Sequence, residues 1–493
     1  MTAVRVAAVD LGATSGRVMA GAVSADALSL TEAHRFPNGG VPVRDALVWD
    51  VVGLHREVLA GLRAVARGGP LHGVGIDSWA VDHGLLDRDG ALLGPVFSHR
   101  DRRTDGVAAR VRGRIGAHEL YGITGLQDLP FNTINQLVAA QGTAAYESAV
   151  TMLLLPDLLG YWLTGELGAE RTNASTTQLY DARAGEWSAE VARRVGIPLG
   201  LLPPLRSPGD VIGPLLPSVA ADVGVGPGVP VIAVGSHDTA SAVVGVPAAD
   251  ERFAYISSGT WSLVGLELLA PVLTEDARLA DFTNEAGVDG TVRFLRNVTG
   301  LWVLTESVRA WTTDGPGAVD SLLAAAAREP ALRTVVDIGD VRLLPPGTAA
   351  DPMPARIAAL ARAAGEPVPV TPAAVTRCVL DSLALAYRRH VRAAVTLADH
   401  PVDVVHVVGG GSRNELLCAL TADACELPVL AGPTEAAAIG NVLLQARALG
   451  VDLPDVAAMR ALVRRTHPVR RFRPSSHLDW AAAETRLPDK DRT

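Results

Sequence analysis

The chain has 493 residues, of which 48% are hydrophobic and 20% charged, and its formal net charge is −9. This length allows about two or three domains, and the composition is that of a globular enzyme, which excludes a disordered chain or a short-period repeat protein. The negative charge argues against nucleic acid as the main partner, because phosphate backbones are bound by basic surfaces. We therefore expect a soluble enzyme that does not bind nucleic acid.

The sequence favours a cytoplasmic location without membrane contact. Its three cysteines, Cys378, Cys418 and Cys425, form no CxxC pair, so we expect buried free thiols in a reducing compartment. The N-terminus enters a strand at once and has no signal-peptide pattern. The most apolar stretch, 150–165, is interrupted by a Pro-Asp pair and is too short to span a bilayer.

The first predicted element is a β-hairpin over 6–23, in which two apolar runs flank the turn DLGATSG. Consecutive N–H groups in such a glycine-rich turn can form an anion-binding nest. Asp10 ends the first strand, where its carboxylate could hold Mg²⁺ directly or through water; the alternative is an aspartate that only caps the turn. Thr14, Ser15 and Arg17 could donate hydrogen bonds to phosphate oxygens.

Residues 71–86 read as a strand, a kink and a second strand, with Asp77 and Asp82 on either side of Trp79. Polar groups beside an aromatic face suit a sugar ring, and two turn aspartates beside a core tryptophan are an equal alternative. An irregular polar block follows over 97–204, which we interpret as a cap over a substrate cleft.

Residues 229–244 predict a buried strand and then a helix of small residues, with the sequence SHDT at their junction. Asp238 falls in the first helical turn, beyond the strand ends where ligands bind in open α/β sheets. It could accept a proton from a substrate hydroxyl. The helix dipole predicts a lowered pKa for Asp238 and a weak base that mainly orients the hydroxyl. The alternative is an ordinary helix N-cap.

A second hairpin, FAYISSGTWSLVGLEL, begins at residue 253 and repeats the pattern of the first. Two such hairpins predict two related domains that each contact phosphate, with a nucleotide bound between them. We place the boundary within 245–252, which gives an N-terminal domain over 1–248, a C-terminal domain over 249–455 and a tail over 456–493. From about Val463 the tail is arginine-rich, and we expect a solvated surface segment there.

Farther along, the pattern predicts a helix over 378–397, a strand over 404–408 and a helix after residue 435. The sequence VVGGGSRN at 407–414 leaves room for a flat ring such as adenine against bare backbone. A simple strand-to-helix turn is the alternative. The GxGxxG and GxxxxGK[ST] spacings of other nucleotide sites are absent.

With these segments in view, the chain resembles the FGGY family of carbohydrate kinases, and within it the members that phosphorylate L-rhamnulose. The matching segments extend over nearly the whole chain: AVDLGATSGRVM (8–19), LPFNTINQL (129–137), LPDLLGYWLTG (155–165), TNASTTQL (172–179), SHDTASAV (236–243), SSGTWSL (257–263), VVGGGSRN (407–414) and AGPTEAAAIGN (431–441).

The resemblance implies an α/β fold of two actin-like, ribonuclease-H-type domains with an interdomain cleft. It implies transfer of a phosphoryl group from ATP to O1 of the ketose, with Mg²⁺ and with Asp238 as the proton acceptor. The implied ATP-binding residues are Ala13, Thr14, Ser15, Gly16, Arg17, Thr260 and Gly410. The implied ketose-binding residues are Ala80, His237, Asp238, Thr239 and Asn297, and Asp10 is the implied metal ligand.

This chain departs from the family pattern at four places. Ala80 replaces a glycine that contacts sugar, which adds a methyl group to the pocket, and His83 places an ionisable ring where an aromatic hydrocarbon is usual. Asn135 replaces a tyrosine. Thr305 stands where relatives often have a glutamine near the nucleotide, so we do not assign it to the site.

Two other functions stay open at this point. One is a kinase of the same family that acts on L-fuculose, L-ribulose or xylulose, because one methyl group changes discrimination by only about 1–3 kcal/mol. The other is a non-catalytic nucleotide switch on the actin-type fold, which would need neither a sugar pocket nor a base. We expect a monomer or small homo-oligomer that binds ATP and a small ketose.

Overall fold

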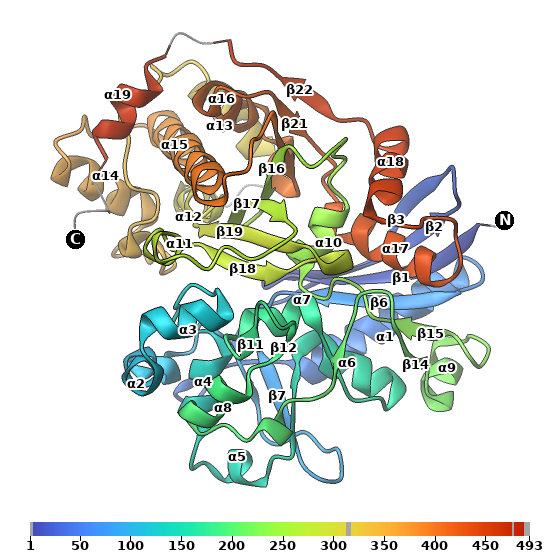
Figure 1. Ribbon diagram of the computed structural model, residues 1–493. Helices are drawn as coiled ribbons and strands as arrows, with labels where there is room; N and C mark the ends of the chain where they lie inside the picture. The colour runs from blue at the N-terminus through green and yellow to red at the C-terminus, as the bar shows by residue number, and fades with distance from the viewer. Residues whose placement is uncertain (1–2, 312–316, 476–477, 488–493) are drawn as a thin grey trace. The chain divides into compact units, whose positions relative to one another are not determined.

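The computed structural model describes residues 3–311, 317–475 and 478–487 (Figure 1). The chain forms two compact units, and each is assembled from three separate segments. The first unit comprises Met1–Ala249, Glu267–Phe294 and Ala436–Thr466, and the second comprises Asp250–Leu266, Leu295–Glu435 and His467–Thr493.

The first unit is built on a six-stranded sheet with the order β14-β15-β6-β1-β2-β3. Its strands are β1 (Val4–Leu11), β2 (Ser15–Val23), β3 (Leu28–Pro37), β6 (Gly73–Ser78), β14 (Val211–Pro214) and β15 (Pro230–Ile232). The β1–β2 hairpin is antiparallel, as predicted, and β6 lies parallel to both β1 and β15. The carboxyl ends of β1, β6 and β15 therefore meet at one edge of the sheet.

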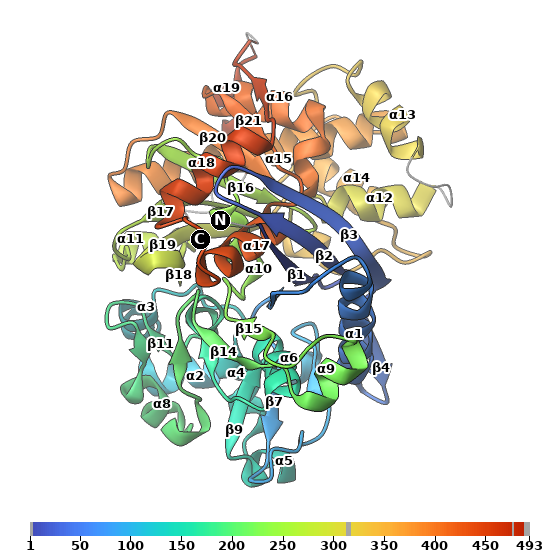
Figure 2. The same ribbon diagram turned by 90° about the vertical axis from the view of Figure 1, so that its right-hand side faces the viewer.

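Helices cover both faces of this sheet. Successive residues of β1 point to opposite sides, so its side chains contribute to the apolar cores on both faces. Val9 packs with α1 (Val51–Arg67) in one apolar cluster, and Ala8 packs with α17 (Ala436–Ala448) in another. Figures 1 and 2 show these two helices on opposite faces of the sheet. The last segment of the first unit thus completes a sheet that the N-terminus begins.

Residues 97–204 are largely helical, so the prediction of an irregular polar block is wrong. The helices of this part are α2 (Val107–Ile115), α3 (Ala117–Thr124), α4 (Thr133–Ala140), α5 (Ala144–Ser148), α6 (Leu155–Thr164), α7 (Arg171–Ala174) and α8 (Ala189–Val195). Most of them bury a core of their own, with Val111, Leu137 and Val191 almost inaccessible, whereas α6 packs into the apolar cluster that also holds Val9 and α1. The helices that share the separate core are short, and each contributes only a few apolar residues to it, which conceals their periodicity in the sequence.

Short strands and helices complete the first unit. The strands are β4 (Gly40–Val43), β5 (Ala46–Trp49), β7 (His83–Leu86), β8 (Val96–Phe97), β9 (Thr151–Leu154), β10 (Ala169–Glu170), β11 (Tyr180–Asp181), β12 (Glu186–Trp187), β13 (Leu205–Arg206) and β18 (Thr283–Ala286). The further helices are α9 (Pro217–Val223), α10 (Asp238–Val244), α11 (Glu275–Leu279) and α18 (Val456–Thr466). Helix α18 buries Met459, Leu462 and Val463. The arginines of the predicted surface segment that follows are exposed, as expected: Arg464, Arg465, Arg470, Arg471 and Arg473.

The second unit contains strands in the order β17-β16-β20-β21-β22. They are β16 (Phe253–Ser258), β17 (Ser262–Leu268), β20 (Val404–Val408), β21 (Val429–Ala431) and β22 (Arg470–Phe472), and β19 (Val292–Val298) begins in the first unit and ends in the second. The helices are α12 (Trp302–Trp311), α13 (Gly317–Ala326), α14 (Met353–Ala363), α15 (Pro372–Ala398), α16 (Glu415–Cys425) and α19 (Trp480–Thr485).

The second unit confirms the elements predicted for it: the hairpin after residue 253, the helix over 378–397 and the strand over 404–408. The three cysteines are free and buried, as expected, and burial raises the pKa of each thiol to about 12. Among the residues that the structure describes, no helix is both long and apolar enough to cross a membrane.

Candidate active site

The turn between β1 and β2 is a closed loop held by backbone hydrogen bonds. The Gly12 N–H donates to the Ser15 carbonyl oxygen at 2.9 Å, and the Asn38 side chain donates to the Gly12 carbonyl oxygen at 2.8 Å. Gly16 faces the ring of Phe36, where a Cβ would lie 2.3 Å from Cζ. A side chain at position 16 would therefore displace Phe36 from the core.

Asp10 lies near the end of β1, and its carboxylate forms an ion pair with Arg17 near the start of β2. Its Oδ2 accepts hydrogen bonds from Arg17 Nε at 2.9 Å and Arg17 Nη2 at 2.7 Å. Asp77 is its neighbour on the parallel strand β6 and is fully buried. Burial raises the pKa of Asp77 well above its usual value, and the nearby Asp10 carboxylate raises this pKa further.

Asp238 begins α10, immediately beyond the carboxyl ends of β6 and β15. The chain is fixed there by a parallel bridge between His237 and Ser78, with the Ser78 N–H donating to the Ser236 carbonyl oxygen at 2.9 Å. His237 is the N-cap residue of α10 and its side chain makes no capping bond, so Asp238 is not the N-cap considered as an alternative. The Thr239 hydroxyl donates to Asp238 Oδ1 at 3.0 Å. The Asp238 side chain is 34% exposed.

The pKa of Asp238 is raised, so the prediction of a lowered pKa is wrong. Partial burial of the carboxyl group is the largest cause, and the Asp10 carboxylate adds to it, while His237 and Thr239 act in the opposite direction. Asp238 is therefore a stronger base than the helix position alone indicates.

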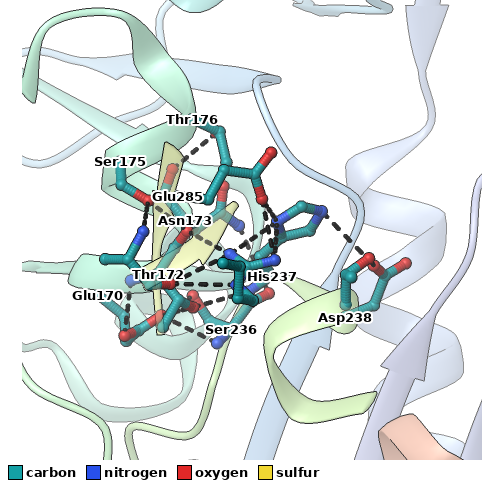
Figure 3. Close-up of polar contacts among 12 residues, drawn as sticks. Glu170, Thr172, Asn173, Ser175, Thr176, Ser236, His237, Asp238 and Glu285 are labelled. Atoms are coloured by element: carbon teal, nitrogen blue, oxygen red, sulfur yellow. Dashed lines mark hydrogen bonds and ion pairs between the residues drawn. The ribbon is translucent and has the colours of Figure 1, made fainter. Parts of the chain in front are cut away.

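Behind Asp238 lies a network of buried polar side chains (Figure 3). His237 Nδ1 is 3.0 Å from Glu285 Oε2, and His237 Nε2 is 3.6 Å from Asp238 Oδ1. Arg293, fully buried, lies 2.9 Å from the same oxygen of Glu285. Glu170 accepts hydrogen bonds from the backbone N–H and the hydroxyl of Ser236, each at 2.9 Å.

Glu170, Glu285 and Arg293 are the charged members of this network that no sequence motif indicated. Glu285 and Arg293 stand on strands β18 and β19, and Glu170 ends the two-residue strand β10. Glu170 is followed directly by Arg171, and β19 carries Arg296 as well as Arg293, so the buried charges do not differ in the sequence from exposed ones. A charged residue is rarely buried unless it is paired, and these partners lie in other segments.

A second buried cluster surrounds Asp82, in the segment that the sequence assigned either to sugar binding or to the core. Asp82 Oδ2 accepts hydrogen bonds from Trp49 Nε1 at 2.7 Å, Trp79 Nε1 at 2.8 Å and His99 Nδ1 at 2.8 Å. The rings of Trp49 and Trp79 have centroids 4.3 Å apart. Trp79 is only 7% exposed, so it is a core tryptophan and not an open platform for a sugar. Ala80 lies on the same loop and is partly exposed.

His83 follows this loop and is buried. Burial lowers its pKa to about 3, and the positive charge of Arg103 lowers it as well. The ring is therefore neutral at physiological pH and replaces the aromatic hydrocarbon of the family pattern without adding a charge.

In the second unit, the glycines of 409–411 differ in their surroundings. A Cβ on Gly409 would lie 2.8 Å from the Ser258 carbonyl oxygen, and one on Gly411 would lie 2.0 Å from Ser258 Oγ. A Cβ on Gly410 would meet no atom within 4 Å. The outer two glycines thus pack against β16, and the middle one faces open space, as a ring-binding position requires.

The predicted site residues are divided between the two units. The first unit holds Asp10, Ala13, Thr14, Ser15, Gly16, Arg17, Ala80, His237, Asp238 and Thr239, and the second holds Thr260, Asn297 and Gly410. Within the first unit, Asp10, Asp77 and Asp238 lie close enough for their charges to interact. Thr260 is in the β16–β17 turn, where its carbonyl oxygen accepts the Trp302 N–H at 3.0 Å. In the described part of the chain, no group of three or more His, Cys, Asp or Glu side chains is arranged to hold a metal ion.

Comparison with known proteins identifies the class to which this chain belongs. Residues 6–245 match the N-terminal domain of the FGGY family of carbohydrate kinases, and residues 254–449 match the C-terminal domain of the same family. The chain is thus a carbohydrate kinase of the FGGY family, which uses ATP.

Among curated proteins, the chain is similar to rhamnulokinases over nearly its whole length. It is 41% identical to the rhamnulokinase of Bacteroides thetaiotaomicron over 97% of both chains. It is also 41% identical to that of Pectobacterium carotovorum, over 98% of this chain and 95% of the relative.

Solved structures share the fold at low identity. Gluconate kinase from Lactobacillus acidophilus matches with a TM-score of 0.81 and 15% identity, over 98% of this chain and 96% of that one. Plasmodium falciparum glycerol kinase with ADP matches with a TM-score of 0.76 and 13% identity, over 98% and 96%. The predicted α/β class with actin-like domains is confirmed.

Proposed function

We propose that this protein phosphorylates L-rhamnulose at O1 with ATP, which gives L-rhamnulose 1-phosphate and ADP in the breakdown of L-rhamnose. The observation that carries the proposal is Asp238, a partly exposed carboxylate with a raised pKa beside His237. The similarity to rhamnulokinases over nearly the whole chain supports the choice of sugar.

Asp238 would accept the proton of the O1 hydroxyl as the oxygen attacks the γ-phosphorus of ATP. Phosphoryl transfer depends mainly on positioning and on electrostatic stabilisation, so the base must hold the hydroxyl in line with the leaving group. The hydrogen bond from Thr239 fixes the orientation of this carboxylate. Ala80, His237, Thr239 and Asn297 would contact the ketose.

The phosphates of ATP would lie on the β1–β2 turn, where Ala13, Thr14, Ser15, Gly16 and Arg17 offer N–H, hydroxyl and guanidinium donors. Thr260 and Gly410 would contact the nucleotide from the second unit, and the open space beside Gly410 supports this role.

Asp10 would hold Mg²⁺, which when bound neutralises charge on the phosphates. Mg²⁺ in kinases is commonly held by one or two carboxylates, substrate phosphates and water, so a single carboxylate at the strand end fits this ion.

We also propose that the protein is cytoplasmic, that it acts as a monomer or small homo-oligomer, and that 1–248 and 249–455 are its two FGGY-type domains.

The proposal is tested by ADP release from MgATP with L-rhamnulose, L-fuculose, L-ribulose and D-xylulose, and with glycerol as a control. Highest kcat/KM on L-rhamnulose, with a product phosphorylated at O1, would support the proposal. Preference for another ketose would support the proposed phosphoryl transfer but show that L-rhamnulose is not the preferred substrate. ATP turnover that no sugar stimulates would reject the sugar-kinase function.

A further inference from the structure

The two residues that precede the proposed base are bonded through their backbone to another segment of the first unit. The Ser236 N–H and hydroxyl both donate to Glu170 Oε2, at 2.9 Å each. The His237 N–H donates to the Thr172 hydroxyl at 3.3 Å. Two successive N–H groups before Asp238 are therefore held by side chains of the segment 170–172 (Figure 3).

The carboxylate of Glu170 organises these contacts. Its Oε1 accepts the Thr172 N–H at 2.8 Å, and its Oε2 accepts the Thr172 hydroxyl as well as the two groups of Ser236. A carboxylate can accept about four hydrogen bonds, so these donors use its capacity. The Thr172 hydroxyl gives its one proton to Glu170, which leaves its oxygen to accept the His237 N–H. Glu170 thus holds Ser236 directly and His237 through Thr172.

This contact joins two parts of the chain that are distant in sequence. Glu170 ends β10, is the N-cap residue of α7 and is only 1% exposed. Ser236 follows β15 in the chain and is also buried. Asn173 on α7 lies close to the Ser236 carbonyl oxygen, with Nδ2 at 3.4 Å. Because Asp238 begins α10 two residues after Ser236, any shift of the Ser236 backbone displaces the carboxylate of the proposed base.

We propose that Glu170 is a positioning residue, which fixes the backbone of Ser236 and His237 and thereby sets where Asp238 presents its carboxylate to the ketose. Glu170 is buried and acts through the backbone, without contact with the substrate. This role rests on the proposed function, because Asp238 is the proton acceptor there. Phosphoryl transfer depends mainly on positioning, and a displacement of about 1 Å can lower a rate about 10²-fold.

Glu170→Gln tests this role with a small change in shape. An amide has one acceptor oxygen and an NH2 group that only donates. With its oxygen toward Ser236, the NH2 group faces the Thr172 N–H, and in the reverse orientation it faces both donors of Ser236. Donors oppose each other in either case, so the backbone of residues 236 and 237 should lose hydrogen bonds or move.

The first test measures hydrogen exchange in protein without ligands, by mass spectrometry of peptides that contain residues 236 and 237. We expect these two amides to exchange about tenfold faster, or more, in Glu170→Gln than in the unchanged protein. Asp157→Asn is the matched control. Asp157 is also buried and accepts the Glu170 N–H at 3.2 Å, a bond that an asparagine oxygen can still accept. Exchange should be normal in the control, and equal exchange in the two variants would overturn the proposal.

The second test separates positioning from a loss of folded protein. In Glu170→Gln we expect kcat for the preferred ketose to fall about 100-fold, while KM for ATP changes less than about twofold. Calorimetry should still find one ketose site per chain, and Asp157→Asn should keep kcat within about twofold. If Glu170→Gln does not fold, Thr172→Val replaces it, because it removes the acceptor of the His237 N–H with little change in shape. Thr172→Val should then lower kcat about tenfold, and Thr172→Ser, which retains the hydroxyl, should not.

A double-variant cycle shows whether Glu170 acts through Asp238. With Asp238→Asn there is no base to misplace, so the addition of Glu170→Gln should lower the residual kcat less than about threefold. A further loss of about 100-fold would overturn the positioning role, as would normal kcat in folded Glu170→Gln. If the unchanged protein phosphorylates no ketose, the proposed function fails, and hydrogen exchange still decides whether Glu170 holds the backbone before Asp238.

Discussion

Gly440 on α17 lies directly against the backbone of Ser241 on α10. A Cβ on Gly440 would be 1.8 Å from the Ser241 carbonyl oxygen, and a Cβ on Gly245 would be 2.4 Å from the Ala436 carbonyl oxygen. Small residues thus bring the two helices into backbone contact. Because α10 begins with Asp238, this contact fixes the helix that carries the proposed base.

Gly440→Ala should therefore destabilise the protein strongly. The added methyl group cannot be accommodated without moving a helix backbone, and we expect a loss of about 3 kcal/mol in the free energy of unfolding. Gly160→Ala is the matched control, because Gly160 is also in a buried helix, but its Cβ would lie 3.8 Å from the nearest atom, Ile212 Cδ1. This control should be neutral or more stable by up to about 1 kcal/mol. Urea unfolding of both variants measures the difference, and equal stabilities would contradict the close approach.

Asp238→Asn should keep the binding of ATP and sugar but lose most turnover. The amide preserves the shape of the side chain and cannot accept the hydroxyl proton, so we expect kcat to fall about 10²–10⁴-fold. Calorimetry of ligand binding and steady-state kinetics check the two halves of this prediction. Near-normal turnover would remove Asp238 from the role of base.

The raised pKa of Asp238 predicts how activity depends on pH. A base must be deprotonated to act, so kcat/KM should decline as the pH falls through the pKa of Asp238. Burial and the Asp10 carboxylate place this pKa above the ordinary value of 3.8. A profile of kcat/KM against pH should thus show an acidic limb with its midpoint above 3.8, which reports the free enzyme. A limb at or below that value would contradict the assignment.

Asp82→Asn should weaken the core around the two tryptophans. Asp82 Oδ2 accepts three hydrogen bonds, from Trp49, Trp79 and His99, and an amide cannot supply a charged acceptor to all of them. We expect the free energy of unfolding to decrease by about 2 kcal/mol, together with a shift in tryptophan fluorescence. Asp89→Asn changes a side chain that is 77% exposed and should leave both measurements unaltered.

His83→Phe should change how stability depends on pH. The pKa of His83 is about 3 in the folded protein and 6.5 for an exposed histidine, so the unfolded chain binds the additional proton between these values. Stability is therefore lost as the pH falls below 6.5, by about 2 kcal/mol at pH 5 from this one group. The phenylalanine variant should lack this component in unfolding curves measured from pH 7.5 to pH 5. An unchanged pH dependence would show that His83 can be protonated in the folded protein.

The sequence predicted the local elements of the sheets well. The hairpins at 6–23 and after residue 253 depend on glycine, serine and threonine at fixed positions in the turn, and such signals act over a few residues. The strand over 404–408 is a mostly apolar run that three glycines follow directly. The helices of 97–204 were missed because most of them are short and their apolar residues face a shared core.

Candidate site residues could be proposed from the sequence where one segment carries them. Asp10 and Asp238 each lie at or beyond the end of a strand, and the structure places their carboxylates close enough to interact. Glu285 and Arg293 lie far from both in the sequence and acquire meaning only when β18 and β19 bring them to His237. The raised pKa of Asp238 could not be predicted from the sequence either, because it depends on burial of the carboxyl group and on the Asp10 carboxylate of another strand.

The interleaved segments of the first unit also determine when it can fold during synthesis. Helix α17 covers the face of β1 that presents Val6 and Ala8, yet it belongs to the segment Ala436–Thr466. A ribosome needs roughly 10–40 s to translate from residue 249 to residue 466. Throughout that interval the nascent chain carries an apolar sheet face without its partner, which is a substrate for chaperones. A fragment that ends at residue 249 would keep that face uncovered permanently and should aggregate.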